Sequence, residues 1–589
     1  MSYPFLALQP TGLTIADDWI RMGFQFHAAG NLGEAEQKYM RALGRVPNHP
    51  IATNNLALCH IGAGMIHQGL LDMERAVLFA PDHAVIRANY AFALLAGDRP
   101  LTALEEARKA VGLAEPNPTT DEIERAGYIL SRQALATALS STGRADQAAP
   151  LHAEALSLNA TNFGSGIAAC FLPTLRDVGP EQALPPRAAW RAAHGYKGNV
   201  WPHSNKRDPD RPLRVGYVSG DFKTHSAAFI FSHVLLNHSP DFVPYFYATY
   251  QGNPDADAMT LRLMLAAGAV KEDDENDGPP IRVKDDHRWR DISKVSDENV
   301  DELIRSDEID ILVDLSGHTN ANRLPLFTRR PAPVQVTGWG FAVGTGLPEI
   351  DAFFADPVTV PDDERQYYAE EVVYLPCTMT YRPPVEYGFP GTSPLPYYAN
   401  EHVTFGCFGR FEKMSDSYLA AVAEILRRVP NSQAYFKDAG FKRPDHIRRV
   451  RASLDVDHSR LLFGMATPHV DHIQSYQMVD LFLDTFPHTM GETILEAFYM
   501  GVPAITLHGR APAARLAASA MTAIGRTEWI TKTQAEYIEK AVTLACDPVA
   551  LAKPRKTLRD ELVNSPVVEG YPQAVEAAYR ALWRRWCEQ

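Results

Sequence analysis

The chain has 589 residues, of which 46% are hydrophobic and 22% charged, a composition that suits several folded domains and excludes a disordered protein. Lys and Arg total 57 against 71 Asp and Glu, giving a net charge of −14, which excludes a general nucleic-acid binder with a basic face. The cysteines are scattered and no leader or bilayer-length apolar stretch is present, so we expect a cytoplasmic protein without a membrane span, a zinc ribbon or a dense disulfide framework.

The first 115 residues repeat with a period of 34. Small residues recur at positions 23, 57 and 91, and other columns keep the same step: Gly30 and Gly64; Ala42, Ala76 and Ala110; Pro47 and Pro81. Small residues where two helices approach, with Gly in the turn between them, are typical of the tetratricopeptide repeat. The alternative is an ordinary helical bundle with accidental periodicity. We predict a tetratricopeptide repeat domain over residues 1–160, with a looser fourth unit at 121–159.

The remainder of the chain predicts two α/β domains. A proline-rich connector occupies residues 161–212. Short apolar runs that end in Gly or Ser then predict buried parallel strands at 213–218, 309–315 and 334–338, in a Rossmann-like domain over 213–375. A linker at 376–400 precedes a second such domain over 401–589, with predicted strands at 403–408, 434–436, 461–463, 481–483 and 504–507. Two consecutive domains of this type place a ligand cleft at the carboxyl ends of their strands.

Polar residues follow the first predicted strand of each domain. His225 lies five residues beyond Gly220, in a loop without the GxGxxG fingerprint of dinucleotide binding. Arg410 and Lys413 lie three residues apart in the corresponding turn of the second domain, so both cations could reach one anion. The alternative is a solvated basic pair.

A third segment offers an anion site. A predicted strand ends at Asp484, and Gly491 with Thr493 opens a helix whose free N–H groups and dipole favour a phosphate. Glu496 lies one turn further on, within reach of a sugar hydroxyl.

Four segments together resemble the O-linked N-acetylglucosamine transferase (SPINDLY-like) family: LRVGYVSGDFKTH, RRPAPVQVTGWG, FGRFEKMSDSYLAAVAEILRRVPNS and DTFPHTMGETILEAFYMGVPAITLHGR. The resemblance covers roughly residues 213–545, and members of that family also carry tetratricopeptide repeats in front. It implies a GT-B glycosyltransferase, with two facing Rossmann-like domains. It further implies inverting, metal-independent transfer of a sugar from a nucleotide donor, UDP-GlcNAc, to Ser or Thr of a protein recognised by the repeats. The nucleotide sugar is then a substrate, and no cofactor is expected.

The resemblance also assigns roles to individual residues. It implies catalytic roles for His225, where acceptor and donor meet, and for Lys413, on the donor diphosphate. The donor-binding residues that it implies are Arg410, Thr467, His469, His472, Gly491, Glu492, Thr493 and Glu496. Among these, His472 stacks on the base, Thr493 contacts phosphate and Glu496 binds ribose. His225 is the most suitable general base, and Asp314 and His318 are further candidates.

The chain departs from the family at the start of this helix. Met490-Gly491-Glu492-Thr493 stands where the family has Gly-Thr-Thr or Gly-His-Thr-Thr, and a carboxylate facing a diphosphate would repel it. Arg410, where some members carry Gln, adds a compensating charge. These departures keep open a flagellin glycosyltransferase that uses a CMP-activated nonulosonic acid. An enzyme of this fold that acts on a glycan, lipid or small molecule, and a non-catalytic scaffold, are further alternatives.

Overall fold

The computed structural model describes residues 14–114, 122–250, 257–268, 270–271, 281–282, 287–341, 343–383 and 387–589. Parts of the predicted repeat domain (1–13 and 115–121) and of the predicted linker (384–386) lie outside the described residues. The chain divides into two compact units, residues 1–172 with 442–449 and residues 173–441 with 450–589.

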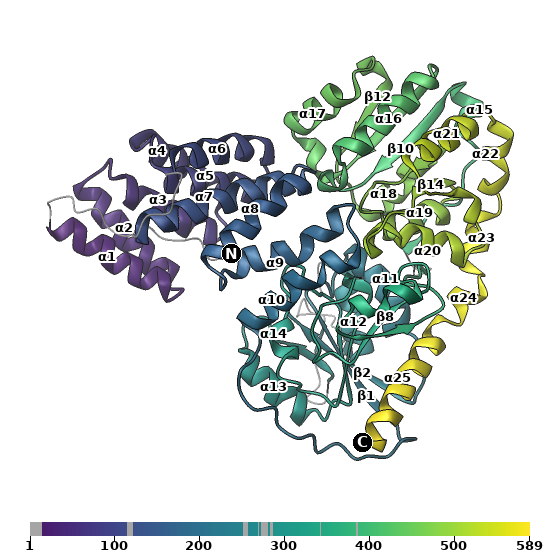
Figure 1. Cartoon of the computed structure of the whole chain (residues 1–589), viewed down its shortest axis with the longest axis horizontal. Coiled ribbons are helices and arrows are strands. Elements are labelled where there is room, and N and C mark those ends of the chain that lie inside the picture. Colours follow the sequence, from purple (N-terminus) through teal and green to yellow (C-terminus); the bar gives the residue numbers. More distant parts are fainter. Residues whose placement is uncertain are drawn as a thin grey trace. The chain divides into compact units, whose positions relative to one another are not determined.

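The first unit consists of helices that pack as consecutive pairs (Figure 1). They are α1 (Thr14–Ala28), α2 (Leu32–Arg45), α3 (Pro50–Gly62), α4 (Ile66–Phe79), α5 (Ala84–Ala96), α6 (Pro100–Leu113), α7 (Glu122–Ser140), α8 (Ala145–Leu158) and α9 (Phe163–Phe171). The alanine column of the repeat is buried in this unit: Ala42, Ala76 and Ala110. The helical tetratricopeptide-like fold predicted from the 34-residue period is confirmed.

Steric contacts and turn geometry explain two further columns of the repeat. A Cβ atom on Gly23 would lie 2.6 Å from the ring of Tyr39, so the column of small residues makes room for the neighbouring helix. Gly30 and Gly64 have φ of 79° and 83°, the left-handed region that glycine enters without a steric cost. The next turn, 34 residues on, holds Asp98 with φ of 56°. Aspartate is one of the few other residues that tolerate this conformation.

The second unit contains two parallel sheets. The first has the strand order β5-β2-β1-β6-β7-β8-β9. Its strands are β1 (Leu213–Ser219), β2 (Phe242–Ala248), β5 (Trp289–Asp291), β6 (Ile311–Asp314), β7 (Val334–Thr337), β8 (Ala352–Ala355) and β9 (Glu371–Tyr374). The associated helices are α10 (Leu184–His194), α11 (Ser226–Leu235), α12 (Ala258–Ala266), α13 (Asp297–Ser306) and α14 (Leu324–Phe327). A short antiparallel pair, β3 (Val270–Lys271) and β4 (Ile281–Arg282), stands apart from this sheet.

The second sheet has the order β12-β11-β10-β13-β14-β15. Its strands are β10 (Val403–Phe408), β11 (Ser432–Lys437), β12 (Leu461–Gly464), β13 (Leu481–Leu483), β14 (Ala504–Leu507) and β15 (Ile530–Thr531). The helices of this part are α15 (Tyr397–Asn400), α16 (Asp416–Arg428), α18 (His469–Ser475), α19 (Glu492–Tyr499), α20 (Leu516–Ala523), α21 (Gln534–Ala545), α22 (Pro548–Arg555), α23 (Leu558–Val563) and α24 (Pro566–Glu569). A further helix, α17 (Pro444–Leu454), begins in residues of the first unit and ends in residues of the second. Two Rossmann-like sheets after a helical repeat region confirm the predicted fold class.

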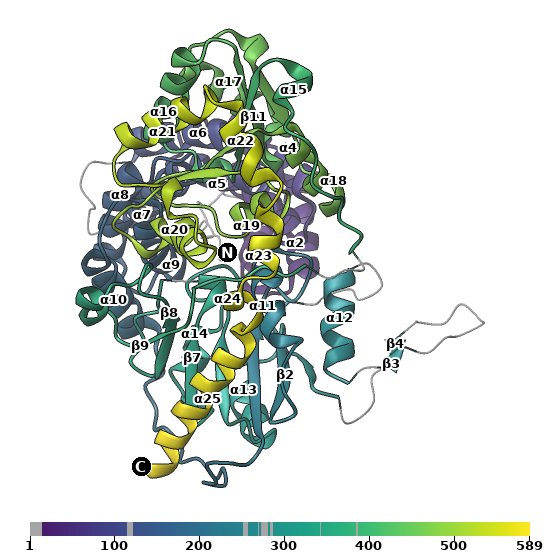
Figure 2. The same cartoon turned by 90° about the vertical axis from the view of Figure 1, so that its right-hand side faces the viewer.

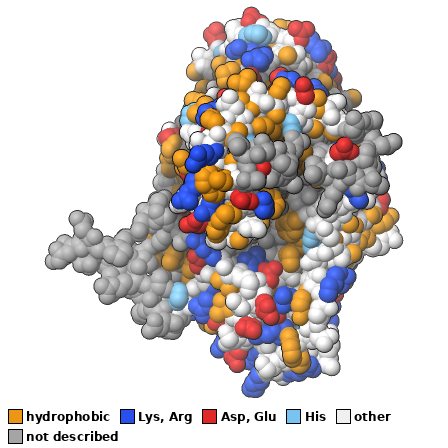
Figure 3. Space-filling model, turned by 90° about the vertical axis from the view of Figure 1, so that its left-hand side faces the viewer, with side chains coloured by type: hydrophobic (Ala, Val, Ile, Leu, Met, Phe, Trp, Pro, Cys, Tyr) orange, Lys and Arg blue, Asp and Glu red, His pale blue; other side chains and the backbone are white. Residues whose placement is uncertain are grey.

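The last helix, α25 (Tyr571–Glu588), returns to the first sheet, along whose strands it runs in Figure 2. The Nε1 of Trp339, which follows β7, donates to the hydroxyl of Tyr571 at 2.9 Å, and the hydroxyls of Tyr217 and Tyr579 lie 3.3 Å apart. Trp583 is fully buried. One continuous apolar core therefore includes residues of both sheets and of α25. On the face drawn in Figure 3, basic and acidic side chains are interspersed.

Candidate active site

Both sheets reverse their strand order at one point, and several of the predicted site residues follow the strands on either side of these two points. The reversal falls between β1 and β6 in the first sheet and between β10 and β13 in the second. Ligands of open α/β sheets bind in the crevice at the carboxyl ends of such strand pairs. His225 follows β1, Arg410 and Lys413 follow β10, and Asp484 follows β13.

Lys413 ends a short 3₁₀ turn (Phe411–Lys413) after β10. Its Nζ donates to the carbonyl oxygen of Thr489 at 3.0 Å, which links this turn to the loop before α19. Burial, with the charge of Arg410, lowers the pKa of Lys413 to about 7, against the opposing charges of Asp484 and Glu412. The ammonium is therefore poorly compensated within the protein, and an anion beside it would stabilise its charge.

Arg410 is more exposed, with 60% of its side chain accessible, and its Nη1 pairs with Glu412 at 3.0 Å. The predicted convergence of Arg410 and Lys413 on one anion stays a prediction, because Arg410 is engaged with Glu412. Its charge also lowers the pKa of His225, a smaller effect than that of burial. The loop after β1, with His225, and the turn after β10, with Arg410, therefore lie close enough for their charges to interact.

Asp484 organises the loop that leads to α19. Its fully buried carboxylate accepts from the N–H of Met490 at 2.8 Å and from the hydroxyl of Thr506 at 2.6 Å. Burial raises the pKa of Asp484 to about 7, although Thr506, Met490 and Lys413 oppose this. Asp484 was predicted only to end a strand, without a role in the site. The available signal was an acidic residue directly after an apolar strand.

The N-terminus of α19 is the candidate anion site. Gly491 is the N-cap, and no side chain caps the first N–H groups of the helix. Those groups and the helix dipole favour a negative charge. A Cβ atom on Gly491 would lie 3.2 Å from the Sδ of Met379, so a larger residue would crowd this turn. Glu492 and Thr493 form the first turn, as predicted.

Glu496 joins residues from two helices. Its Oε1 lies 2.7 Å from the Nε2 of His469, and its Oε2 lies 3.1 Å from the Nε2 of His472 and accepts from the hydroxyl of Tyr476 at 2.9 Å. The two imidazoles lower the pKa of Glu496 despite its burial. Burial and the neighbouring Glu496 carboxylate raise the pKa of Glu492 well above its usual value. The neutral form of Glu492 is therefore favoured relative to that of an exposed glutamate.

Aromatic rings surround the two histidines. The ring of His469 lies 4.4 Å from that of Phe229 on α11 and 5.0 Å from that of Phe389, between centroids. His472 lies 6.0 Å from Phe408, at the end of β10. The predicted stacking of His472 on a nucleobase is not tested by these contacts, but they place both imidazoles in an aromatic setting.

Thr467 precedes α18 in an exposed segment. Its Oγ1 accepts from the Nζ of Lys437 at 3.0 Å, and Lys437 also donates to the carbonyl oxygen of Met465 at 2.9 Å. Lys437 is 5% exposed, and burial lowers its pKa. Lys437 was not among the predicted site residues, although it ends β11 and Asp438 follows it directly.

The three candidate general bases differ in their surroundings. His225 caps α11, where its Nδ1 accepts from the N–H of Ala227 at 3.2 Å and lies 3.7 Å from Asp221. Burial raises the pKa of Asp314 to about 6, and its carboxylate accepts from the N–H of Gly317 at 2.9 Å. The Nε2 of the buried His318 donates to the carbonyl of Thr345 at 2.7 Å. His225 alone of these three is substantially exposed.

A donor set for a cation also occurs here. Ligand atoms of His469, Glu492 and Glu496 all lie within 4.8 Å of one another, the one such group found among the described residues. The hydrogen bond between His469 and Glu496 uses one atom of each, so a metal would have to displace it.

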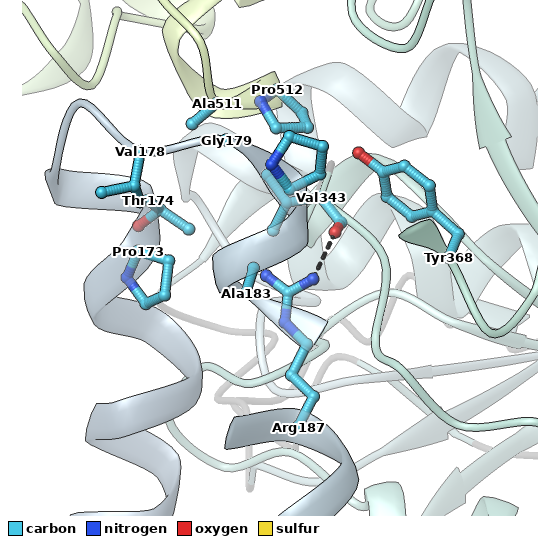
Figure 4. A pocket seen from close by; sticks show the side chains of 11 residues that line it. Pro173, Thr174, Val178, Gly179, Ala183, Arg187, Val343, Tyr368, Ala511 and Pro512 are labelled. Atoms are coloured by element: carbon cyan, nitrogen blue, oxygen red, sulfur yellow. Dashed lines mark hydrogen bonds between the residues drawn. The ribbon is translucent and has the colours of Figure 1, made fainter. Parts of the chain in front are cut away.

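A separate pocket has a different set of lining residues. Figure 4 shows the side chains that line it, among them Thr174 and Arg187 of the connector, Tyr368, and Pro512. The Nη1 of Arg187 donates to the carbonyl of Val343 at 2.7 Å. The lining of this pocket includes none of the predicted site residues.

The family model for glycosyl transferase family 41 matches residues 195–381 and 394–574, which include every predicted site residue. The chain belongs to glycosyl transferase family 41. Similar proteins include a probable UDP-N-acetylglucosamine–peptide N-acetylglucosaminyltransferase, SPINDLY, of Arabidopsis thaliana, 36% identical over 65% of this chain and 41% of that protein. The SPINDLY protein of Petunia hybrida is 34% identical over 68% of this chain and 41% of that protein. The family resemblance predicted from the motifs is confirmed.

A solved structure supports the same assignment. A mutant O-GlcNAc transferase of Thermobaculum terrenum matches 99% of both chains with a TM-score of 0.70 and 26% identity. This family 41 chain spans about two fifths of the length of the curated relatives that it matches. Among the described helices, none is long and apolar enough to cross a membrane.

Proposed function

We propose that this chain transfers a sugar from a nucleotide donor to a Ser or Thr hydroxyl of a protein, with inversion and without a metal ion. The observation that carries the proposal is the pairing of Lys413 with the uncapped N-terminus of α19 beside the second sheet's reversal point. UDP-GlcNAc is the donor that the names of the relatives support.

The chemistry needs stabilisation of the leaving group. Breaking the bond between the sugar and the phosphate leaves a nucleotide anion, and groups aimed at that developing charge lower the barrier. The Lys413 ammonium and the N–H groups of Gly491, Glu492 and Thr493 supply this stabilisation. Lys413, whose pKa is lowered to about 7, gains a counterion when the phosphate binds.

The acceptor hydroxyl would approach from the side of His225. The loop after β1 presents this half-exposed imidazole, while the charge of Arg410 reaches it from the other domain. Because Nδ1 accepts from the Ala227 N–H, a neutral ring carries its proton on Nε2. His225 in this state orients the acceptor or the donor by donating a hydrogen bond, and it would need the other tautomer to take the acceptor's proton through Nε2.

The helical repeat unit is the proposed recognition surface for the acceptor protein. Stacked helix pairs form extended surfaces that bind peptide segments along their length. The acceptor and the nucleotide sugar are thus the two partners that we propose.

A CMP-linked donor is the second candidate. Glu492 was its main support, because a carboxylate at this position would repel a diphosphate. Burial and Glu496 raise the pKa of Glu492, which favours its neutral form and so weakens that repulsion. The UDP-linked donor is therefore favoured.

The test is transfer with defined components. The purified full chain is incubated with a co-expressed acceptor protein and UDP-GlcNAc in EDTA, and intact-mass spectrometry records the acceptor. One N-acetylhexosamine added to a Ser or Thr, mapped by fragmentation, is the expected result. If the acceptor is modified only when a CMP-linked sugar is supplied, UDP-GlcNAc is not the donor. If transfer is lost in EDTA and recovers in Mg²⁺ or Mn²⁺, the reaction is not metal-independent.

A further inference from the structure

Lys437 is a buried cation at the edge of the second sheet where ligands bind. It ends β11, it is 5% exposed, and it makes no ion pair among the described residues. Burial of a charge without a paired opposite charge costs free energy, which other contacts must offset. The contacts that the ammonium makes are two hydrogen bonds to one segment. Its Nζ donates to the carbonyl oxygen of Met465 at 2.9 Å and to the Oγ1 of Thr467 at 3.0 Å.

The segment that Lys437 holds, residues 465–467, joins β12 to α18 and is exposed. The side chain of Met465 offers an apolar surface, since this residue is 55% exposed. The N–H groups of Ala466 and Thr467 have no hydrogen-bond partner among the described residues. Pro468 follows and restricts Thr467 to extended backbone conformations. The segment is therefore fixed by a buried lysine and a proline, while its backbone groups remain available to a ligand.

The order of the strands places this segment beside the candidate anion site. In the sheet, β12 is separated from β10 by β11 alone, and Lys413 follows β10. Neighbouring strands lie about 4.8 Å apart, so the ends of β10 and β12 are about 10 Å apart along one edge. A nucleoside can span such a distance from a phosphate beside Lys413. Nucleobases are bound through hydrogen bonds to their edges and through packing on their faces, and the segment offers groups for both.

We propose that Lys437 is a positioning residue for the nucleobase of the donor, and that it acts by holding the 465–467 segment in the conformation that binds the base. This inference rests on the proposed function, since it assumes a nucleotide whose phosphate lies beside Lys413. A segment that is already ordered loses less conformational freedom when the ligand binds, so the ligand binds more tightly. The roles that the family resemblance implies for His472 and Glu496 are unchanged.

The experiment compares ligands with and without a base. Lys437→Met removes the three donors of the ammonium and keeps most of the stem. The full chain is titrated calorimetrically with UDP and with inorganic pyrophosphate. We expect the affinity for UDP to weaken roughly tenfold and that for pyrophosphate to stay unchanged. In the transfer assay the KM for the nucleotide sugar should rise by a similar factor, with kcat within about twofold of the wild type, because Lys437 acts away from the reacting atoms.

Variants of Thr467 test the route by which Lys437 acts. Thr467→Val removes the hydroxyl that accepts from Nζ and keeps the shape of the side chain, whereas Thr467→Ser keeps the hydroxyl. We expect the valine variant to lose UDP affinity and the serine variant to resemble the wild type. The double variant Lys437→Met/Thr467→Val should bind UDP about as well as Lys437→Met alone, because both changes break the same contact. Lys553→Met removes an exposed lysine of α22 and should leave every value unchanged.

The outcomes separate this inference from the proposed function. Unchanged UDP affinity in Lys437→Met, or an equal loss for UDP and pyrophosphate, overturns it. A loss in Lys437→Met with none in Thr467→Val shows that the lysine does not act through the segment, and overturns it as well. If Lys437→Met melts early, the contrast between Thr467→Val and Thr467→Ser decides, since Thr467 is exposed. If pyrophosphate binds too weakly to titrate, the split between KM and kcat decides. Failure of the wild type to bind either UDP or CMP overturns the proposed function itself.

Discussion

Removal of the Lys413 charge gives the sharpest test of the proposed chemistry. Lys413→Met keeps most of the aliphatic stem and removes the ammonium that faces the loop before α19. We expect kcat/KM to fall by about 10²–10³, the usual cost of one lost group at a developing oxyanion. Lys413→Arg keeps the charge in a different shape and should lose less.

The structure also predicts how kcat/KM depends on pH. The pKa of Lys413 falls from 10.5 to about 7, and at about 1.4 kcal/mol per pKa unit the site holds the ammonium ~5 kcal/mol less favourably than water does. The active form is protonated, so kcat/KM, which reports the free enzyme, should decline as pH rises through about 7. The Asp484 carboxylate helps to retain this proton, so Asp484→Asn should move the decline to lower pH.

The assay is initial-rate transfer to the acceptor protein between pH 5.5 and 9.5, with melting temperatures measured alongside. Lys413→Arg should remain active further into the alkaline range, because an arginine keeps its charge throughout. A Lys413→Met rate within threefold of the wild type, or a wild-type kcat/KM that is level from pH 7 to 9, would show that this ammonium does not stabilise the leaving nucleotide.

Three further predictions concern the supporting structure. Asp484→Ala leaves the Met490 N–H and the Thr506 hydroxyl without their acceptor, so chemical denaturation should show a loss of about 1–3 kcal/mol in the free energy of unfolding; an unchanged midpoint would contradict this. Gly23→Ala should cost about 1–3 kcal/mol through its clash with Tyr39, while the control Gly112→Ala, where a Cβ meets nothing within 4 Å, should be neutral or stabilising. Deletion of residues 1–115 should reduce modification of a protein acceptor and leave the calorimetric nucleotide affinity unchanged; lost affinity in a soluble variant would refute the division of roles.

Much of the fold could be predicted because its signals are local. The 34-residue columns reflect helix contacts that recur in each repeat, and β1, β10 and β14 are apolar runs of the length that buried strands need. β2 was missed because Pro244 interrupts a strand that is only half-buried in its middle. β15, with two residues, is too short for any periodicity.

The candidate site was predictable only in part. Lys413 and Gly491 could be predicted as site residues from their neighbours in the sequence, because one follows a predicted strand and the other begins a predicted helix. The hydrogen bonds of Glu496 could not be predicted in this way, since they depend on how α18 packs against α19. The hydrogen bonds of Lys437 to the segment before α18 are likewise a property of the packed structure.

The return of α25 to the first sheet has a consequence for synthesis on the ribosome. The first sheet is complete in sequence by residue 374, yet Tyr571, Tyr579 and Trp583 belong to its core. Domains tend to fold in the order in which they are synthesised. Here the ribosome must add almost two hundred residues after β9 before α25 can complete the core of the first sheet. The nascent first half therefore exposes an apolar face that chaperones can bind, and a premature stop codon before residue 571 would leave that face uncovered.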